Sequence, residues 1–188
     1  PLYNPAYSQF CYAIPFMPGQ TQYMDTPVVP VQAFADGYNP PDCAYPDATP
    51  AVSTVVGDPL PGGGSGPWVS APLHTLTINA LGDQPVPNSG YTGPAATAAP
   101  FNAKFVTRHY GFGAQGPDSS VTIGDQPAII QSWSDSQIKV LVPPLTADQS
   151  SCPIQQPGQP QATCGELVIN ADNGKSSIDA VTVTIGGK

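Results

Sequence analysis

The sequence from residue 121 to residue 143 reads VTIGDQPAIIQSWSDSQIKVLVP, and this stretch decides the fold. Apolar side chains recur at every second position in 121–123 and 137–142, and residues 128–133 form another short apolar run. A period of two residues is typical of a strand that buries one face. Gly124-Asp125 and Ser134-Asp135-Ser136 separate these runs and are turn-forming residue types. We therefore expect three short strands joined by tight turns.

Short apolar runs separated by turn-forming residues continue on both sides of this stretch. Leu76 and Ile78, with Ala80, should point inward from their strand, and Asn173-Gly174 is a strong hairpin signal. Gly111-Phe112-Gly113 should interrupt a strand as a bulge, and residues 82–103 read as a long loop. The sequence has no convincing helix, and strands recur about every 8–12 residues, as in a β-sandwich. Further strands are expected at 51–56, 75–81, 104–110, 165–170 and 180–185.

The composition excludes several classes of protein. Only 10% of the residues are charged, and the formal net charge is -8. An acidic surface repels phosphate backbones and anionic lipids, so binding to nucleic acid or to a membrane surface is disfavoured. No segment approaches the roughly 20 apolar residues of a membrane span. The 25 prolines and 19 glycines fit many short strands joined by turns.

Four cysteines predict two disulfides and an oxidising compartment. Four cysteines allow three pairings, and no Cys-x-x-Cys motif suggests a metal site. Cys152 and Cys164 flank a stretch rich in Gln, Pro and Gly, which a disulfide would close into a pinned loop. Cys11 then pairs with Cys43. Because the chain starts at Pro1 and ends at Gly186-Gly187-Lys188, we expect it to be part of a longer secreted protein.

Residues from about 50 to 187 resemble an IPT/TIG domain, which has an immunoglobulin-like fold. The resemblance rests on an ordered series of pieces: Leu76-Thr77-Ile78, Tyr110-Gly111-Phe112-Gly113, Val121-Thr122-Ile123-Gly124, Gln131-Ser132-Trp133 and Val140-Leu141-Val142-Pro143. It implies a sandwich over residues 49–188, with Trp133 filling the space between the sheets. Residues 1–48 are rich in proline and aromatic side chains, and we expect an extended segment there that ends a preceding β module and forms a linker. The whole chain is similar to segments of very large secreted bacterial proteins.

No catalytic group, cofactor or firm metal site is predicted. A nucleophile needs a His base that is held by an acid, but His74 and His109 lie in strands, and the sequence has no Gly-x-Ser-x-Gly motif. A copper site, as in a fragment of a secreted copper oxidase, would need both histidines to converge with Met17, Met24 or a cysteine. Asp36, Asp42 and Asp47 are candidates for calcium, but their spacing is not diagnostic and turn capping, which fits the glycine and proline residues beside them, is the interpretation we favour.

Aromatic side chains offer an alternative function. Trp68, Tyr91, Tyr38 and Tyr45 are expected in loops, where exposed rings commonly contact ligands such as extracellular glycans. The same tyrosines would also serve to pack the N-terminal segment onto the sandwich, and we favour this packing role. A carbohydrate-binding module that accompanies an enzyme is therefore the alternative hypothesis.

The function predicted from the sequence is that of a non-catalytic structural or adhesive module. The resemblance implies that such a module spaces, orients or binds its neighbours. We expect it to be secreted or exposed at the cell surface. Its expected partners are neighbouring domains of the same polypeptide or other copies of the chain, and an extracellular glycan is the partner under the alternative hypothesis.

Overall fold

The computed structural model describes residues 44–187 except 61, 94, 153–160 and 179–180. The chain divides into two compact units, which are described separately below. One unit comprises Pro1–Tyr45 with Pro85–Arg108, and the other comprises Pro46–Gln84 with His109–Lys188. Residues 85–108 thus belong to a different unit from the residues that precede and follow them.

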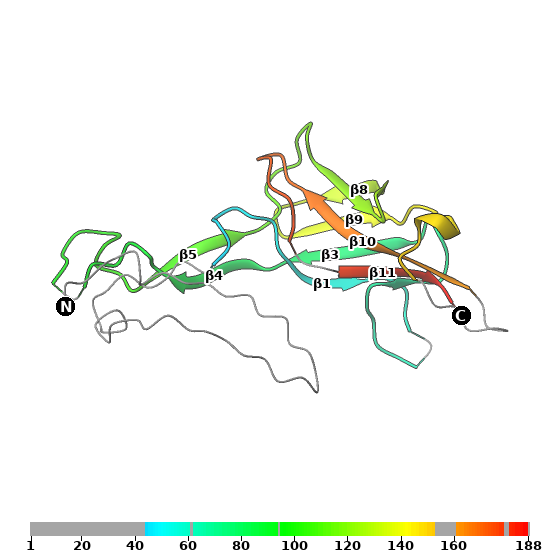
Figure 1. The fold of residues 1–188 in the computed structure, drawn as a ribbon, viewed down its shortest axis with the longest axis horizontal. Helices are drawn as coiled ribbons and strands as arrows, with labels where there is room; N and C mark the ends of the chain where they lie inside the picture. The colour runs from blue at the N-terminus through cyan, green and yellow to red at the C-terminus, as the bar shows by residue number, and fades with distance from the viewer. Residues whose placement is uncertain (1–43, 61, 94, 153–160, 179–180, 188) are drawn as a thin grey trace, which may run out of the picture. The chain divides into compact units, whose positions relative to one another are not determined.

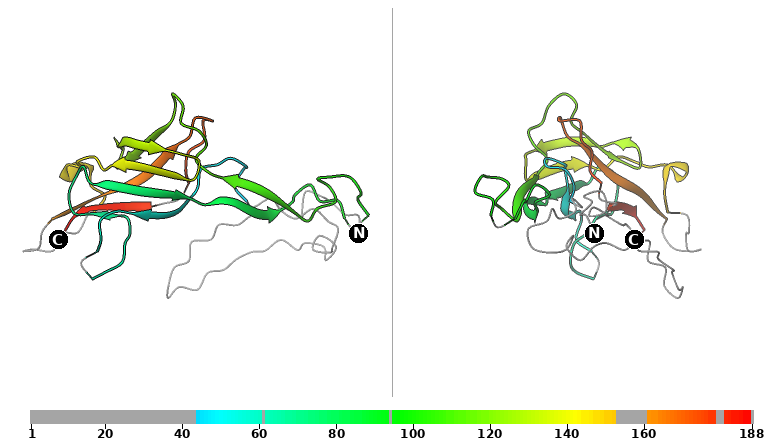
Figure 2. Two further views of the ribbon diagram at one scale, coloured as in Figure 1. Left: turned by 180° about the vertical axis from the view of Figure 1, so that it is seen from behind. Right: turned by 60° about the vertical axis from the view of Figure 1, so that its left-hand side comes forward.

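The second unit is a sandwich of two sheets, which Figures 1 and 2 show from opposite sides. All its strand pairs are antiparallel except β2 with β11, which is parallel. The four-stranded sheet, here the β3 sheet, has the order β1 (Val52–Val56), β3 (Thr75–Ala80), β9 (Gln137–Leu141), β8 (Ile129–Trp133). The five-stranded sheet, here the β10 sheet, has the order β2 (Trp68–Val69), β11 (Val181–Gly186), β10 (Ala162–Asn170), β6 (Ser120–Ile123), β7 (Gln126–Pro127). The prediction of an all-β, immunoglobulin-like sandwich is confirmed.

Alternating apolar side chains fill the space between the two sheets. Leu76 and Ile78 of β3 are 0% exposed, as their alternation predicted, while Ala80 is only partly buried. The core combines inward side chains from both sheets: Leu76, Ile78, Ile138 and Val140 from the β3 sheet, and Val69, Val121, Ile123, Leu167, Ile169, Val183 and Ile185 from the β10 sheet. Burial of these rows fixes the register, because a slip by one residue would turn them toward water.

Phe112, and not Trp133, is the fully buried aromatic residue of the core. Strand β5 (Phe105–Tyr110) ends before Gly111, so the predicted bulge at 111–113 is wrong; this segment leaves the strand and inserts the Phe112 ring, which is 0% exposed. Trp133 packs against the core but stays partly exposed, with its ring centroid 6.3 Å from that of Phe112. Its indole Nε1–H donates to the carbonyl oxygen of Gly113 at 3.0 Å. A donor that needs a polar partner explains why Trp133 occupies the rim.

Two predicted turns are confirmed. Gly124 and Asp125 have φ values of 57° and 61° and connect Ile123 to its register partner Gln126. Positive φ at both central residues defines the type I′ loop, whose twist matches that of the strands. Asn173-Gly174 lies in the turn that follows β10, where Ala171 N–H donates to the carbonyl oxygen of Lys175 at 2.9 Å. This turn and the loop before β6 lie side by side in Figures 1 and 2, and Asp118 N–H donates to Asp172 Oδ1 at 3.1 Å.

The expectation of one long loop over 82–103 is wrong in its first part. Gly82–Pro87 form strand β4, which pairs with β5 in a separate two-stranded sheet. The glycine and the two prolines of β4 made the sequence read as a loop. Proline is tolerated in a strand that has a neighbour on one side only, because its missing N–H then faces away from the ladder.

The remaining described residues of the first unit are organised around Asn88. This side chain is 6% exposed, and its Nδ2 donates to the carbonyl oxygens of Pro100 and Ala103, each at 2.8 Å. Arg108 of the same unit donates to the carbonyl oxygens of Ala44 and Tyr45. None of the described segments forms a helix with the length and apolarity that a membrane span requires.

Candidate functional site

The first candidate site joins an acid, a hydroxyl and an imidazole. Asp58 follows β1, Ser70 follows β2, and His74 precedes β3. Ser70 Oγ donates to Asp58 Oδ2 at 2.6 Å, and Ser70 N–H donates to the same oxygen at 2.8 Å. His74 Nδ1 lies 2.6 Å from Asp58 Oδ2 and 3.3 Å from Ser70 Oγ. These are the three residue types of a hydrolase triad, but they come from positions that carry no motif in the sequence.

Their geometry does not fit nucleophilic catalysis. In a working triad, one ring nitrogen accepts the serine proton while the other donates to the acid. Here Nδ1 faces both partners, and its proton is committed to the carboxylate, which can only accept. The serine proton is also directed at the carboxylate. The hydrogen bonds from Ser70, with that from His74, lower the pKa of Asp58 to about 2. The trio therefore pins together the chain segments that follow β1 and β2.

The second candidate site is an imidazole held between carboxylates, called the His109 clamp below; it consists of Asp47, Asp83, His109 and Asp135. The ring Nδ1 of His109 lies 2.6 Å from Asp83 Oδ1, and Nε2 lies 2.8 Å from Asp135 Oδ1. The backbone N–H of His109 donates to Asp47 Oδ1 at 2.7 Å. Only a doubly protonated ring can donate to two carboxylates at once.

The electrostatics of the clamp agree with a charged imidazole. Hydrogen bonds to Asp135 and Asp83 raise the pKa of His109 from 6.5 to about 9. The bond to His109 lowers the pKa of Asp135 in return. The backbone N–H of His109 is the main cause of the lowered pKa of Asp47. A ring that is protonated near neutral pH is a poor base there, so the clamp is suited to holding structure and not to proton abstraction.

The stability of the chain should fall between about pH 6.5 and about pH 9 because of this histidine. Its pKa is raised on folding, so its contribution is complete below the unfolded value and is lost as the pH rises through the folded value. The side chain is 44% exposed, and after solvent screening we expect a loss of about 1 kcal/mol. Urea unfolding across this range should show the decline in wild type and a flatter profile in His109→Gln. Equal slopes in the two proteins would contradict the assignment.

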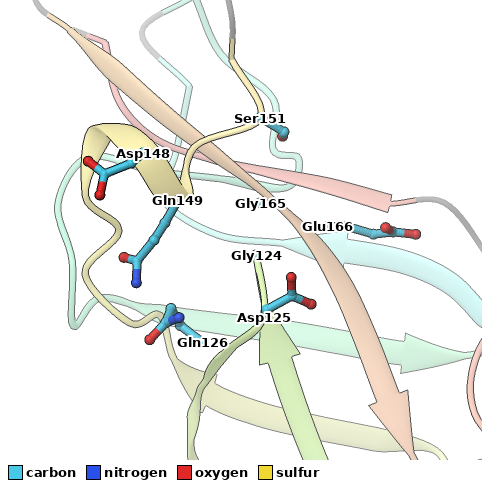
Figure 3. A pocket seen from close by; sticks show the side chains of 8 residues that line it. All are labelled: Gly124, Asp125, Gln126, Asp148, Gln149, Ser151, Gly165 and Glu166. Carbon is cyan, nitrogen blue, oxygen red and sulfur yellow. The ribbon is translucent and has the colours of Figure 1, made fainter.

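The third candidate site is a recess of about 380 Å³ beside the β6–β7 turn, shown in Figure 3. A Cβ atom on Gly165 would lie 2.5 Å from the backbone nitrogen of Gly124, so the two glycines let β10 pass close to the turn. The side chains of Asp148 and Glu166 point away from each other (Figure 3). Within the described ranges, no three His, Cys, Asp or Glu residues are grouped so that they could hold a metal ion. The recess is lined by Gly124, Asp125, Gln126, Asp148, Gln149, Ser151, Gly165 and Glu166.

The residues singled out in the sequence have mixed outcomes. The Cys152–Cys164 disulfide is confirmed, with a Cα–Cα distance of 5.2 Å. Asp47, a calcium candidate, belongs to the His109 clamp. The structure does not bring His74 and His109 together. His74 pairs with Asp58, whereas His109 pairs with Asp83 and Asp135. Seven other candidates lie outside the described residues: Cys11, Cys43, Tyr38, Asp36, Asp42, Met17 and Met24.

The aromatic candidates do not form one platform in the described structure. Trp68 lies in β2 and not in a loop; it is partly buried, and its Nε1–H donates to the carbonyl oxygen of Gly186 at 2.8 Å. Tyr91 is buried with 5% exposure, and the Lys104 ammonium lies 6.0 Å from its ring centroid. Tyr45 is 52% exposed. The interior position of Tyr91 corrects the expectation of an exposed ring.

The sequence analysis missed Asp83 and Asp135 as functional partners. Each lies 26 residues from His109 in the chain, on opposite sides. Asp135 was predicted only as part of a turn, and Asp83 as part of a loop. Carboxylates in turns carry no signal of a distant partner, so these contacts could be found only from the fold.

A comparison with protein families agrees with the fold. The model of the IPT/TIG domain matches residues 110–168, which include β6 to β9 and most of β10. A search of curated proteins found no match. IPT/TIG domains are immunoglobulin-like modules that are generally non-catalytic. The matched residues lie within the sandwich unit, so the resemblance to an IPT/TIG domain over 110–168 and the immunoglobulin-like two-sheet fold agree.

Proposed function

We propose that the chain is a structural or adhesive module of a larger extracellular protein, which spaces its neighbours or binds a protein partner. The observation that carries the proposal is the use of both histidines for holding structure within an IPT/TIG sandwich. In the part of the chain that the structure describes, the hydrogen bonds of the acid–hydroxyl–imidazole trio link chain segments, and the recess beside the β6–β7 turn has carboxylates that point away from each other. These features fit a module that contacts and spaces its neighbours better than they fit an enzyme.

The test of this proposal is a direct search for the competing activities. The purified chain should show no turnover of chromogenic ester and glycoside substrates above the rate of a Ser70→Ala, His74→Ala control. It should also show no binding to a glycan array that depends on Trp68, as judged with Trp68→Phe. Turnover that the double variant abolishes would overturn the proposal in favour of an enzyme. Saturable glycan binding that the Trp68 variant loses would favour the carbohydrate-binding module.

An extracellular location is supported by the Cys152–Cys164 disulfide, because such bonds persist mainly in oxidising compartments. The bond closes a sequence separation of 12 residues. It joins the chain that follows the 3₁₀ helix η3 (Ala147–Gln149) to the start of β10, an inner strand of its sheet. A link of this kind restricts the unfolded chain more than the folded one.

Loss of this disulfide should lower the free energy of unfolding by about 2–3 kcal/mol, the value expected for a loop of this size. The variant to compare with wild type is Cys152→Ser, Cys164→Ser, measured by urea unfolding. Non-reducing peptide mapping of the chain from an oxidising host should recover the 152–164 bond. Quantitative alkylation of both thiols without reductant would contradict the extracellular assignment.

Strand β8 is a surface suited to pairing with a protein partner. It is the last strand of the β3 sheet, its five residues carry no charge and no proline, and Ile129 is 58% exposed. The outer strands of the β10 sheet, β2 and β7, have two residues each, and β7 contains Pro127. Short strands and proline protect sheet edges from pairing, whereas a longer uncharged edge is a template for another strand.

We expect the chain to associate weakly with further copies through β8 at high protein concentration. Ile129→Lys should abolish this association, because a charge on an edge strand blocks sheet extension. Thr77→Lys is the matched control, since it places the same charge on β3, an inner strand of the same sheet. Sedimentation velocity over a concentration series measures the effect. Association that survives Ile129→Lys, or that Thr77→Lys removes equally, would rule out the β8 edge.

A further inference from the structure

The polypeptide crosses between the two units at three places, and the His109 clamp lies beside all of them. The crossings fall between Tyr45 and Pro46, between Gln84 and Pro85, and between Arg108 and His109. Asp47, Asp83 and His109 each lie within two residues of a different crossing. All members of the clamp belong to the sandwich unit. The clamp thus sits where the sandwich releases its three connections.

A single residue, His109, bonds to both of the other connecting segments. Its backbone N–H donates to Asp47 Oδ1 at 2.7 Å, and its carbonyl oxygen accepts the N–H of Ala48 at 2.9 Å. Its ring Nδ1 bonds to Asp83 Oδ1, at the start of β4, at 2.6 Å. These bonds hold the three connecting segments together on the sandwich side, at Asp47, Asp83 and His109. This group of segments is called the stem below.

Asp135 anchors this stem to the sandwich. It lies in the turn between β8 and β9, and its carboxylate accepts both His109 Nε2–H and the backbone N–H of Gly113, at 2.8 and 2.9 Å. Its carbonyl oxygen accepts the N–H of Phe112, whose ring is in the core. The first segment, which follows the Tyr45–Pro46 crossing and contains Asp47 and Ala48, is also held by the turn after β10. Asn173 Nδ2 donates to the carbonyl oxygen of Ala48 at 2.8 Å, and Lys175 Nζ donates to that of Asp47.

Gly111 provides independent evidence that the fold makes room for this ion pair. A Cβ atom at this position would lie 2.2 Å from Asp135 Oδ1 and 2.3 Å from His109 Nε2. Both distances are shorter than any real contact of a Cβ atom, so a side chain at 111 would displace the pair. The space beside the backbone of Gly111 is occupied by the hydrogen bond itself.

The charge of the ring decides whether the clamp can hold. The groups that face it are Asp83 from β4, Asp135 from the β8–β9 turn and Asp47 from the first segment, with Lys175 beside Asp47. An imidazolium donates from both nitrogens, but a neutral imidazole has a single N–H. On deprotonation, one carboxylate therefore faces a lone pair and is repelled. Asp83, which is 67% exposed, is free to turn toward water.

We infer that the His109 clamp is a pH-sensitive conformational joint: protonated His109 ties the three connections to the sandwich, and its deprotonation releases the connection through β4. The inference rests on the proposed role as a spacer, since a joint at this place matters to a module that orients its neighbours. The joint would make the role as a spacer dependent on pH. The tied state is the one populated near neutral pH, because the pKa of His109 is raised to about 9.

Native-state hydrogen exchange of the full chain tests the joint, with His109→Gln compared with wild type. Protection of the amides of Ala48, residue 109 and Gly113 should fall about tenfold at neutral pH, the change that corresponds to about 1.4 kcal/mol of local opening free energy. Wild type above about pH 9, the pKa of the ring, should lose protection at residue 109 and keep that of Gly113, because the neutral ring still donates to one carboxylate.

His74→Gln is the matched control, because His74 is 45% exposed and also pairs with one carboxylate, but it lies at none of the crossings. It should leave the three amides unchanged. Asp83→Asn provides a second route if His109→Gln does not fold, and it should raise exchange at residue 109 without freeing Gly113. Unchanged protection in His109→Gln, or an equal change in His74→Gln, would overturn the joint. None of these results depends on turnover or glycan binding, which test the proposed function.

Discussion

Phe112→Ala should lower the free energy of unfolding by about 3–5 kcal/mol, the largest effect expected for a single side chain in this domain. The ring is 0% exposed and is enclosed by inward side chains of both sheets. Truncation removes the transfer free energy of the ring and leaves a cavity that strands on both sides cannot close. The backbone around it is also fixed, because Phe112 N–H donates to the carbonyl oxygen of Asp135 at 2.8 Å.

Chemical denaturation of Phe112→Ala and of Phe105→Ala separates burial from mere aromatic content. Phe105 lies in β5 and is 62% exposed, so its loss should change stability by less than about 1 kcal/mol. Trp133→Phe should also be mild, since Trp133 occupies the rim of the core. Similar losses for Phe112→Ala and Phe105→Ala would show that Phe112 does not fill the space between the sheets.

Gly57→Ala should cost about 3 kcal/mol, which is unusually large for one added methyl group. A Cβ atom at this position would lie 2.0 Å from the carbonyl oxygen of Trp68 and 2.8 Å from its carbonyl carbon. Both contacts are with backbone, so no side-chain rotation can relieve them. The same oxygen accepts the N–H of Asp58 at 2.9 Å, and a shift of β2 would break this bond as well.

Gly66→Ala is the control for this prediction, because a Cβ atom there has no heavy atom within 4 Å and the residue belongs to the same β1–β2 connection. Its effect should stay within about 0.5 kcal/mol. Thermal and urea unfolding of the two variants make the comparison. A Gly57→Ala protein as stable as Gly66→Ala would mean that β2 does not lie against the end of β1.

The strands could be predicted from the sequence because a strand that buries one face has an apolar side chain at every second position. Leu76 and Ile78 alternate with polar residues, as do Ile138 and Val140, and the structure buries all four. Strand β4 could not be recognised, since Gly82, Pro85 and Pro87 are the residue types of loops. Its pairing with β5 depends on a tertiary neighbour and on having a free edge, which local preference does not encode.

The candidate sites were much less predictable than the fold. The Cys152–Cys164 bond followed from a short separation and an unpatterned loop between the two residues. The His109 clamp did not follow from any local pattern, because its acids come from the start of one strand and from a distant turn. The choice of Phe112 over Trp133 for the core also depended on geometry, since the indole N–H requires an acceptor that only the rim provides.

The parallel pairing of β2 with β11 has a consequence for mechanical load. Within the sandwich, the start of β1 lies beside the end of β3, whereas the end of β11 lies beside β2, which leads into the start of β3. The chain therefore enters and leaves the sandwich at opposite poles (Figure 1). Tension applied along the polypeptide would pull β1 along β3, and β11 along both β10 and β2, so that the hydrogen bonds between these strands are loaded in shear.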